Sequence, residues 1–269
     1  MLEKFGTYTP KKSTIPLQLC RMLGFGRGIL KKKLLKAWHS MGYSIVDTKI
    51  RGINYRLNIV KNTTDGKLLV ASKKYDSEEL SYIKKSFNRD SKSTFIDIGA
   101  NTGYYSLNLA REGFANILSI EANPDVINIL KQNVDCNGFK NQIKVVPCCV
   151  GETGEMNFYT SSGWGSSSVI KQNHKSGRVI RVVSKPLIEI LKEFKIQHID
   201  ALKIDVEGYE DQVLVPFFNE TKQSLHPHLI VLEHCNYSDW STDLIKFLKE
   251  CSYDIVKKTR ANTILKKVK

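Results

Sequence analysis

The chain has 269 residues, of which 41% are hydrophobic and 25% charged, as in a globular protein long enough to bury a full core. No apolar run approaches the roughly 18 residues of a membrane span, and the polar N-terminal stretch lacks the apolar core of a signal peptide. The six cysteines show no C-x-x-C pair or zinc-ligand spacing, which argues against a disulfide framework or a structural metal site. We therefore expect a cytoplasmic protein with buried, reduced thiols.

The net charge of +14 lies at the two ends of the chain. Residues 1–50 carry ten Lys or Arg and two acidic residues, residues 257–269 carry six basic residues and no acid, and the stretch between them is neutral. Basic ends suggest a polyanion or an anionic membrane surface as a neighbour, although solvated surface charge is the commoner meaning. One expectation is therefore that the termini contact the inner face of an anionic membrane.

We expect residues 1–74 to form a basic extension to a main domain over residues 75–269. In the extension, apolar residues recur at helical spacing over residues 28–41 beside several lysines, which predicts a basic amphipathic helix. We favour the interpretation that its apolar stripe caps the domain over the alternative that it lies on a membrane.

Residues 43–72 alternate loosely between apolar and polar, with Asp65-Gly66 between two apolar runs. This pattern predicts a small β element with a turn at that pair. Residues 76–87 then have the period of a helix, and Tyr75 and Glu79 are candidates to cover a ligand.

A strand, a glycine turn and a helix start follow one another over residues 94–107. Residues 94–98 are β-branched and apolar, and Gly99 and Gly103 bracket the turn before the helical period begins. Gly99 can take a backbone angle closed to other residues, and Gly103 lets the helix begin close to the strand and to any ligand there. The pattern is typical of a loop that holds a nucleotide-like cofactor.

An acidic residue ends the next buried strand, over residues 116–120. This is Glu121, 24 residues beyond Asp97. A carboxylate at the tip of the second strand of a βαβ unit can accept hydrogen bonds from both ribose hydroxyls.

The run Asp97-x-Gly99-x-Asn101-x-Gly103 resembles motif I of the class I S-adenosylmethionine (SAM) dependent methyltransferases, with Asn101 where many members have a glycine. A pyrophosphate-binding loop needs that glycine because phosphates approach the backbone, whereas SAM has no phosphate and tolerates a side chain there. Together with the run KIDVEGYE over residues 203–210, the sequence is similar to the FkbM family of methyltransferases. The resemblance covers residues 75–257.

This resemblance implies a three-layer, Rossmann-like α/β fold with a seven-stranded sheet whose last strand is antiparallel, and SAM as the cofactor. The remaining apolar runs fit strands over residues 143–149, 199–204, 229–232, 253–257 and 263–268. Many class I enzymes place an acidic residue after the third strand to meet the adenine; here backbone groups of Cys149 or Val150 take that place. The implied cofactor-binding residues are Asp97, Gly99, Ala100, Asn101, Gly103, Tyr104, Glu121, Ala122, Asn123, Cys149, Val150 and Asp205.

Residues 154–183 depart from βαβ alternation and predict a hairpin around a polar loop that contains Trp164. Such a loop could close over the acceptor or could be an ordinary surface loop, and both interpretations stay open.

Four titratable residues, Asp205, Glu207, Glu233 and His234, follow the fourth and fifth strands of the sheet. FkbM enzymes mostly methylate hydroxyl groups of sugars and polyketide-type molecules, and a hydroxyl is a poor nucleophile until a base removes its proton. We favour His234 or Asp205 as that base. Asp205 with Glu233 could instead bind a divalent ion, although we predict no metal site.

We therefore expect an O-methyltransferase acting on a hydroxyl of a carbohydrate, a glycoconjugate or a related small molecule. Nucleic-acid methylation is the main alternative, but Asp205-Val206-Glu207-Gly208 stands where amino-methylating enzymes have an Asn-Pro-Pro-aromatic motif, and its charge would repel phosphates. A non-catalytic SAM-binding scaffold is the second alternative.

Overall fold

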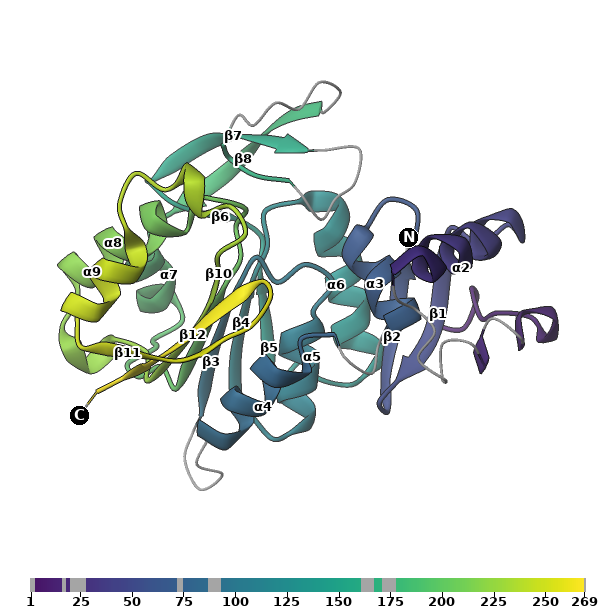
Figure 1. Ribbon diagram of the computed structural model, residues 1–269, viewed down its shortest axis with the longest axis horizontal. Coiled ribbons are helices and arrows are strands. Elements are labelled where there is room, and N and C mark those ends of the chain that lie inside the picture. Colours follow the sequence, from purple (N-terminus) through teal and green to yellow (C-terminus); the bar gives the residue numbers. More distant parts are fainter. Residues whose placement is uncertain are drawn as a thin grey trace.

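A seven-stranded sheet forms the middle layer of the protein in the computed structural model, which describes residues 3–15, 18–19, 28–71, 75–86, 93–160, 167–170 and 178–268 (Figure 1). The strand order is β11-β12-β10-β9-β3-β4-β5. The strands are β3 (Thr94–Ile98), β4 (Asn116–Ile120), β5 (Ile143–Val146), β9 (Ala201–Ile204), β10 (Leu229–Glu233), β11 (Tyr253–Lys258) and β12 (Asn262–Lys267). Pairing is parallel from β5 to β10, and β12 is antiparallel to both β10 and β11. The predicted sheet is therefore confirmed, including its antiparallel last strand.

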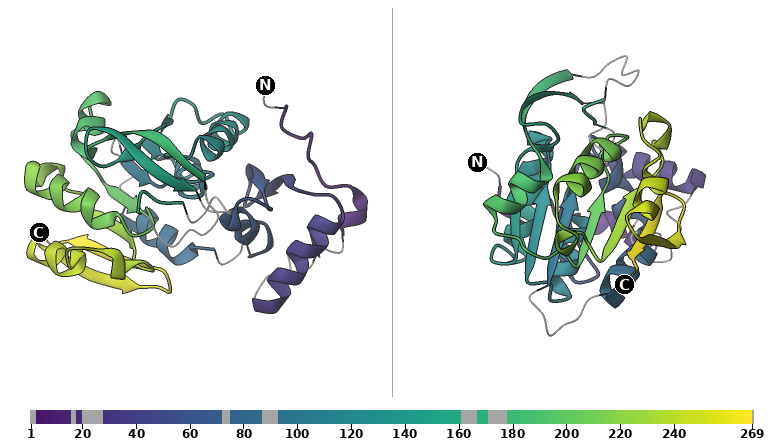
Figure 2. Two further views of the ribbon diagram at one scale, coloured as in Figure 1. Left: turned by 90° about the horizontal axis from the view of Figure 1, so that it is seen from above. Right: turned by 90° about the vertical axis from the view of Figure 1, so that its left-hand side faces the viewer.

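Alternate residues of the central strands supply two separate cores, because successive side chains of a strand point to opposite faces. On β3, Phe95 packs into one core, whereas Ile96 and Ile98 pack into the other. The first core is covered by α4 (Ser77–Ser86), α5 (Tyr104–Arg111) and α6 (Pro124–Cys136), and the second by α7 (Leu187–Glu193), α8 (Glu210–Glu220) and α9 (Leu244–Glu250). These helices make the three-layer arrangement that Figure 2 shows from two further sides.

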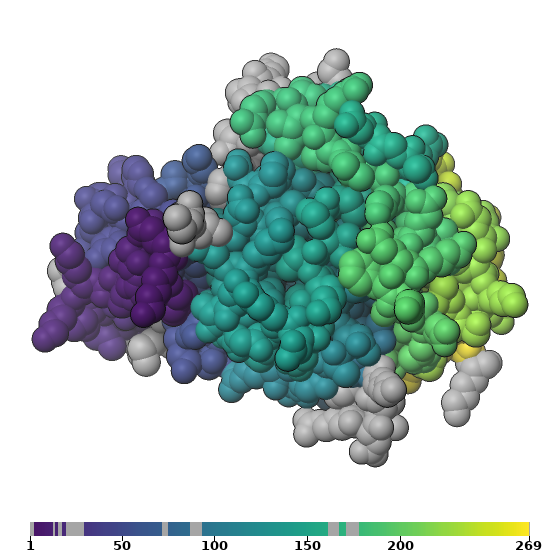
Figure 3. Space-filling model, turned by 180° about the vertical axis from the view of Figure 1, so that it is seen from behind, coloured from purple at the N-terminus to yellow at the C-terminus, as the bar shows by residue number. Residues whose placement is uncertain are grey.

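The N-terminal residues extend the first core at one end of the molecule (Figures 1 and 3). They form η1 (Lys12–Thr14), α2 (Gly28–Ser40), the hairpin of β1 (Ile45–Ile50) and β2 (Ile53–Asn58), and α3 (Thr63–Ala71). Leu34 and Trp38 of α2 are buried in the same core as Phe95 of the central sheet. The apolar stripe of α2 therefore packs on the protein, as we favoured.

The prediction of a turn at Asp65-Gly66 is wrong, because both residues lie inside α3. The side chain of Asn62 accepts hydrogen bonds from the backbone N–H groups of Thr64 and Asp65, which is how a helix start is capped. The hairpin turn lies earlier, at Arg51 and Gly52, which both have positive φ.

A second, three-stranded sheet stands above the carboxyl ends of the central strands (Figure 1). It consists of β6 (Cys149–Val150), β7 (Gly154–Thr160) and β8 (Arg178–Lys185), with β7 and β8 forming the predicted hairpin. The third predicted strand, over residues 143–149, is thus divided: β5 ends at Val146, and Cys149 belongs to the smaller sheet.

The described residues also form two 3-10 turns, η3 (Gln223–Leu225) and η4 (Tyr237–Asp239), and α9 begins at Leu244 because Asp243 caps it. In the part of the chain that the structure describes, no helix is both long and apolar enough to cross a membrane.

Trp38→Ala should lower the free energy of unfolding by about 3–5 kcal/mol, because Trp38 is 1% exposed and fills the junction between α2 and the main core. The measurement is urea unfolding followed by circular dichroism. Leu30→Ala on the same helix is the control, since Leu30 is 50% exposed and should change stability by less than about 0.5 kcal/mol. An unchanged transition for Trp38→Ala would mean that α2 is a detachable segment.

Candidate active site at the strand tips

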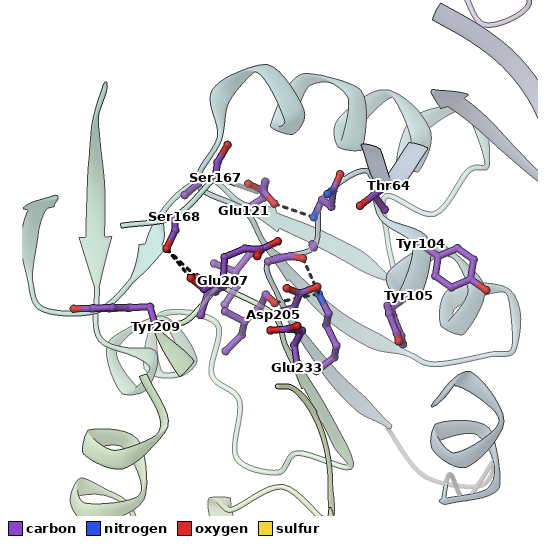
Figure 4. Close-up of a pocket in the computed structure, with 18 of the residues that line it drawn as sticks. Thr64, Tyr104, Tyr105, Glu121, Ser167, Ser168, Asp205, Glu207, Tyr209 and Glu233 are labelled. Atoms are coloured by element: carbon purple, nitrogen blue, oxygen red, sulfur yellow. Dashed lines mark hydrogen bonds and ion pairs between the residues drawn. The ribbon is translucent and has the colours of Figure 1, made fainter. Parts of the chain in front are cut away.

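A cavity of about 390 Å³ opens at the carboxyl ends of β3, β4, β9 and β10, where the order of the strands reverses. Its volume is within the range of small-molecule sites. The predicted residues that line it are Gly99, Ala100, Asn101, Tyr104, Glu121, Ala122, Cys149, Val150, Asp205, Glu207 and Glu233. Figure 4 shows part of this wall, with Thr64, Tyr104 and Tyr105 on one side and Glu121, Ser167 and Ser168 on the other.

The turn after β3 and the turn after β9 touch at Gly99. Gly99 has a φ of +72°, and a Cβ there would lie 1.9 Å from the carbonyl oxygen of Asp205. The predicted special backbone angle of Gly99 is thus confirmed, but what excludes a side chain is the neighbouring turn. Gly103 also has a positive φ, and a Cβ there would meet Leu130 at 2.7 Å. Gly103 therefore serves helix packing and does not line the cavity, contrary to the expected ligand contact.

Asn101 adopts the left-handed conformation, with a φ of +51°, which Asn tolerates better than most residues. Its side-chain oxygen accepts hydrogen bonds from the backbone N–H of Thr102 at 2.9 Å and from Nδ2 of Asn62 at 2.6 Å. Thr102 in turn donates its hydroxyl to Oδ1 of Asp65 at 2.6 Å. Residues of α3 and its cap therefore fix the turn in which Asn101 stands.

Glu121 binds the same turn from the tip of β4. Its Oε2 accepts the backbone N–H of Asn101 at 2.8 Å, and its Oε1 accepts the N–H of Asn123 at 2.9 Å. Burial raises the pKa of Glu121, although these two hydrogen bonds act in the opposite direction. A carboxylate has about four acceptor positions, so Glu121 keeps capacity for a ligand in the cavity that it lines.

Asp97 lies beneath the turn and not in the cavity. It is completely buried; its Oδ2 accepts hydrogen bonds from the hydroxyl (2.6 Å) and N–H (3.2 Å) of Ser106, which fix the start of α5. Its other oxygen has no hydrogen-bond partner among the described residues and lies 3.8 Å from Nζ of Lys203. Asp97 thus positions the turn and is not among the residues that line the cavity. Asn123 also lies outside the lining; it is the N-cap of α6.

Lys203 connects the tips of β9 and β3, a role that the sequence patterns above do not predict. Its Nζ donates to the carbonyl oxygen of Gly99 at 2.8 Å and lies 3.5 Å from Oδ2 of Asp205. Burial lowers the pKa of Lys203, but the carboxylates of Asp205 and Asp97 outweigh that effect and the pKa is raised. The sequence feature that indicates a role for Lys203 is its position in an otherwise apolar, buried strand, where an unpaired lysine is rare.

Three carboxylates meet in the cavity beyond Lys203: Asp205, Glu207 and Glu233 (Figure 4). Asp205 is the most accessible, with 38% of its side chain exposed. Burial and the charges of Asp205 and Glu233 raise the pKa of Glu207 to about 8. The pKa of Glu233 is raised as well, first by burial and then by the charge of Asp205. Glu207 therefore retains its proton at neutral pH.

Glu207 is held in a strained backbone conformation, with a φ of +55°. Nδ2 of Asn236 donates to its Oε2 at 2.7 Å, and the hydroxyl of Ser168 donates to its carbonyl oxygen at 3.1 Å. The carboxylate of Glu210 accepts the N–H groups of Val206 and Gly208 on either side. Glu210 thus has a structural role, because it fixes the backbone around Glu207.

His234 does not line the cavity, because it follows Glu233 directly and so points to the other side of the strand end. Its Nδ1 is 3.0 Å from the hydroxyl of Thr263 on β12. Of the four titratable residues expected at the strand tips, His234 is thus the one that the structure leaves outside the cavity lining. Within the described ranges, no group of three or more His, Cys, Asp or Glu side chains could hold a metal ion, so the Asp205–Glu233 pair gains no third ligand.

The outer wall of the cavity includes Phe158 of β7 together with Ser168 and Val169, and Ser168 pairs with Tyr159 of β7. Trp164, expected in a loop over the acceptor, lies outside the described residues.

Comparison with known proteins gives one family. The family model described as the methyltransferase FkbM domain matches residues 97–255. The methyltransferase sdnD of Sordaria araneosa is 26% identical over 158 residues, which are 47% of this chain and 61% of that protein.

Among solved structures, the methyltransferase FkbM from Methylobacillus flagellatus KT is 17% identical and has a TM-score of 0.44, over 65% of this chain and 43% of that one. M. capricolum TrmK, solved with S-adenosyl-homocysteine, is 16% identical and has a TM-score of 0.42, over 71% of this chain and 66% of that one. Each of these three matches spans less than two thirds of the relative's own length.

Lys203→Met should lower the free energy of unfolding by about 3–5 kcal/mol, because it leaves the buried Asp97 carboxylate without its cation. Adding Asp97→Asn should restore part of the loss, since the amide carries no charge. Chemical denaturation of the two single variants and the double variant gives the coupling energy. Strictly additive losses would show that the Lys203–Asp97 contact is not what stabilises the turn.

Proposed function

The chain belongs to the FkbM methyltransferase family, and on that premise we propose that it methylates a hydroxyl group of a carbohydrate or glycoconjugate. The observation that supports a hydroxyl acceptor is Glu207. It is a carboxyl group in the cavity whose pKa is raised to about 8 and whose Oε2 is held by Asn236. A general base works best when its pKa lies near the operating pH, and an alcohol needs such a base.

The cofactor is SAM, and the residues that line the cavity fit it. Bound there, it would supply an electrophilic methyl group. Glu121 has acceptor positions left for ribose hydroxyls, and Cys149 and Val150 with Phe158 offer an apolar wall of the kind that an adenine needs. The left-handed turn at Asn101 gives the cavity its floor beside Glu121.

The acceptor end is assigned to the tips of β9 and β10. Methyl transfer is an in-line displacement, so alignment of the acceptor oxygen is the main requirement on the protein. Asp205 and Asn236 line the cavity together with Glu207 and can orient neighbouring hydroxyls. Ser168, which binds the Glu207 carbonyl, and Asn236 keep the Glu207 carboxylate from turning away. Proton transfer from the acceptor oxygen to Glu207 would then accompany transfer of the methyl group.

Nucleic-acid methylation is the alternative within the same chemistry. The three clustered carboxylates disfavour a phosphate backbone inside the cavity. Comparing glycans with total RNA as methyl acceptors in one assay separates the two possibilities. SAM binding without methyl transfer to either would instead favour a non-catalytic scaffold.

The rate of methyl transfer should depend on the protonation of Glu207. With its pKa raised to about 8, the base form is scarce at lower pH, so kcat/KM should fall about tenfold per pH unit below 8 and level off above it. The measurement is formation of S-adenosylhomocysteine with a panel of sugars and oligosaccharides as acceptors.

Glu207→Gln should reduce kcat by about 10²- to 10⁴-fold and remove the pH dependence. His234→Gln is the matched control, because His234 lies outside the cavity and should leave both unchanged. A pH profile that survives in Glu207→Gln would assign the base to another residue.

A further inference from the structure

Four cationic residues stand on three segments that are distant in the sequence. Of these segments, α3 and the β11–β12 turn supply residues that line the cavity, and α2 packs on α3 through Leu35 and Gly66. Lys31 and Lys32 belong to α2, Lys67 to α3, and Arg260 to the turn between β11 and β12. They are close enough that burial and then the charges of Lys67, Lys32 and Arg260 lower the pKa of Lys31. We call these four residues the basic rim. The two basic ends of the sequence thus meet in the folded protein.

The basic rim reaches the cavity through Lys67 and through the residues that follow Arg260. Lys67 lines it together with Thr63 and Thr64 of the first turn of α3, and Ala261 and Asn262, which follow Arg260, line it as well. Figure 4 shows Thr64 on the wall opposite Ser168, and Figure 1 shows α2 beside α3.

The packing of these segments fixes the basic rim in place. Gly66 leaves room for Leu35 of α2, since a Cβ there would lie 3.1 Å from the leucine side chain. The β11–β12 turn is tied to α4, because Oε1 of Glu79 accepts hydrogen bonds from Thr259 (2.6 Å) and Asn262 (3.0 Å). Arg260 therefore stands on an anchored turn and not on a free loop.

No ion pair within 4.0 Å joins any of the four cations to a carboxylate of the described residues. Glu79, the acid bound to the β11–β12 turn, is buried and holds Thr259 and Asn262. Asp65 of α3 is buried too, with its oxygens bound to Thr102 and Asn58. The rim is thus a concentration of positive charge without nearby carboxylates. The N-terminal end of the α3 dipole adds to the attraction for anions.

The charge inside the cavity has the opposite sign, since the carboxylates of Asp205 and Glu233 lie beyond Lys203. An anion entering the cavity is repelled by these carboxylates and attracted by the rim. We propose that the acceptor is a phosphate ester of a sugar: its phosphate binds Lys67 and Arg260 with support from Lys31 and Lys32, and its free hydroxyl points to Glu207. A phosphate carries up to two charges and several acceptor oxygens, so it can satisfy more than one of these cations at once.

This inference rests on the proposed function, because it assigns the cavity an acceptor. The test is calorimetric titration of the protein loaded with S-adenosylhomocysteine, using inorganic pyrophosphate as the probe. We expect saturable binding, weakened at least about tenfold in Lys67→Glu and in Arg260→Glu. Lys249→Glu, an exposed lysine of α9 remote from the rim, is the charge-matched control and should bind pyrophosphate as the wild type does.

A parallel titration with S-adenosylhomocysteine alone separates the two proposals. If the wild type fails to bind it, the proposed function fails. If Lys67→Glu loses that binding, the rim serves the carboxylate of the cofactor and the phosphate inference is overturned. Binding of a short RNA without saturable binding of pyrophosphate would also overturn it.

The source of the phosphate is distinguished by vesicles of phosphatidylglycerol and phosphatidylcholine. Sedimentation with the anionic vesicles that depends on Lys67 and Arg260 would support a lipid-borne phosphate. Binding of pyrophosphate without sedimentation would support a soluble phosphate ester.

Discussion

The contact on which the site depends is the one between the tips of β3 and β9. Lys203 donates to the carbonyl oxygen of Gly99 and lies between the carboxylates of Asp97 and Asp205. Because Lys203 is buried, this arrangement is stable only while all three groups are present. It brings the turn that starts at Gly99 against the turn that starts at Asp205, so closely that only glycine fits. The residues proposed for the cofactor and those proposed for the acceptor thereby line one cavity.

Much of the fold could be predicted from the sequence, because it depends on local patterns. The apolar runs predicted the seven strands of the central sheet. The failures came from tertiary contacts. Asp65-Gly66 has the composition of a turn, but the cap at Asn62 and burial against α2 make it helical. Glu233 and His234 are neighbours at the end of β10. They point to opposite sides of the strand, and only Glu233 lines the cavity.

The motif residues have different physical roles that their spacing alone does not reveal. Asp97 is the first residue of the motif, yet it is buried beneath the turn and binds Ser106. Asn101 replaces a common glycine because Asn tolerates the left-handed conformation, and its amide group then bonds to Asn62. Lys203 precedes Asp205 in the sequence, and its buried ammonium group lies between the carboxylates of Asp97 and Asp205. The position of the basic C-terminal segment likewise becomes clear only in the fold, where Ala261 and Asn262, which follow Arg260, line the cavity.

The most direct test of this account is calorimetric titration of the purified protein with S-adenosylhomocysteine, comparing wild type with Glu121→Ala and with Glu112→Ala. Glu121 lines the cavity and holds the turn at Asn101, whereas Glu112 forms a half-exposed ion pair with Lys84 on the surface. The account predicts that the wild type and Glu112→Ala bind equally, and that Glu121→Ala binds at least about tenfold more weakly. Equal binding by all three proteins, or no binding by the wild type, would contradict it.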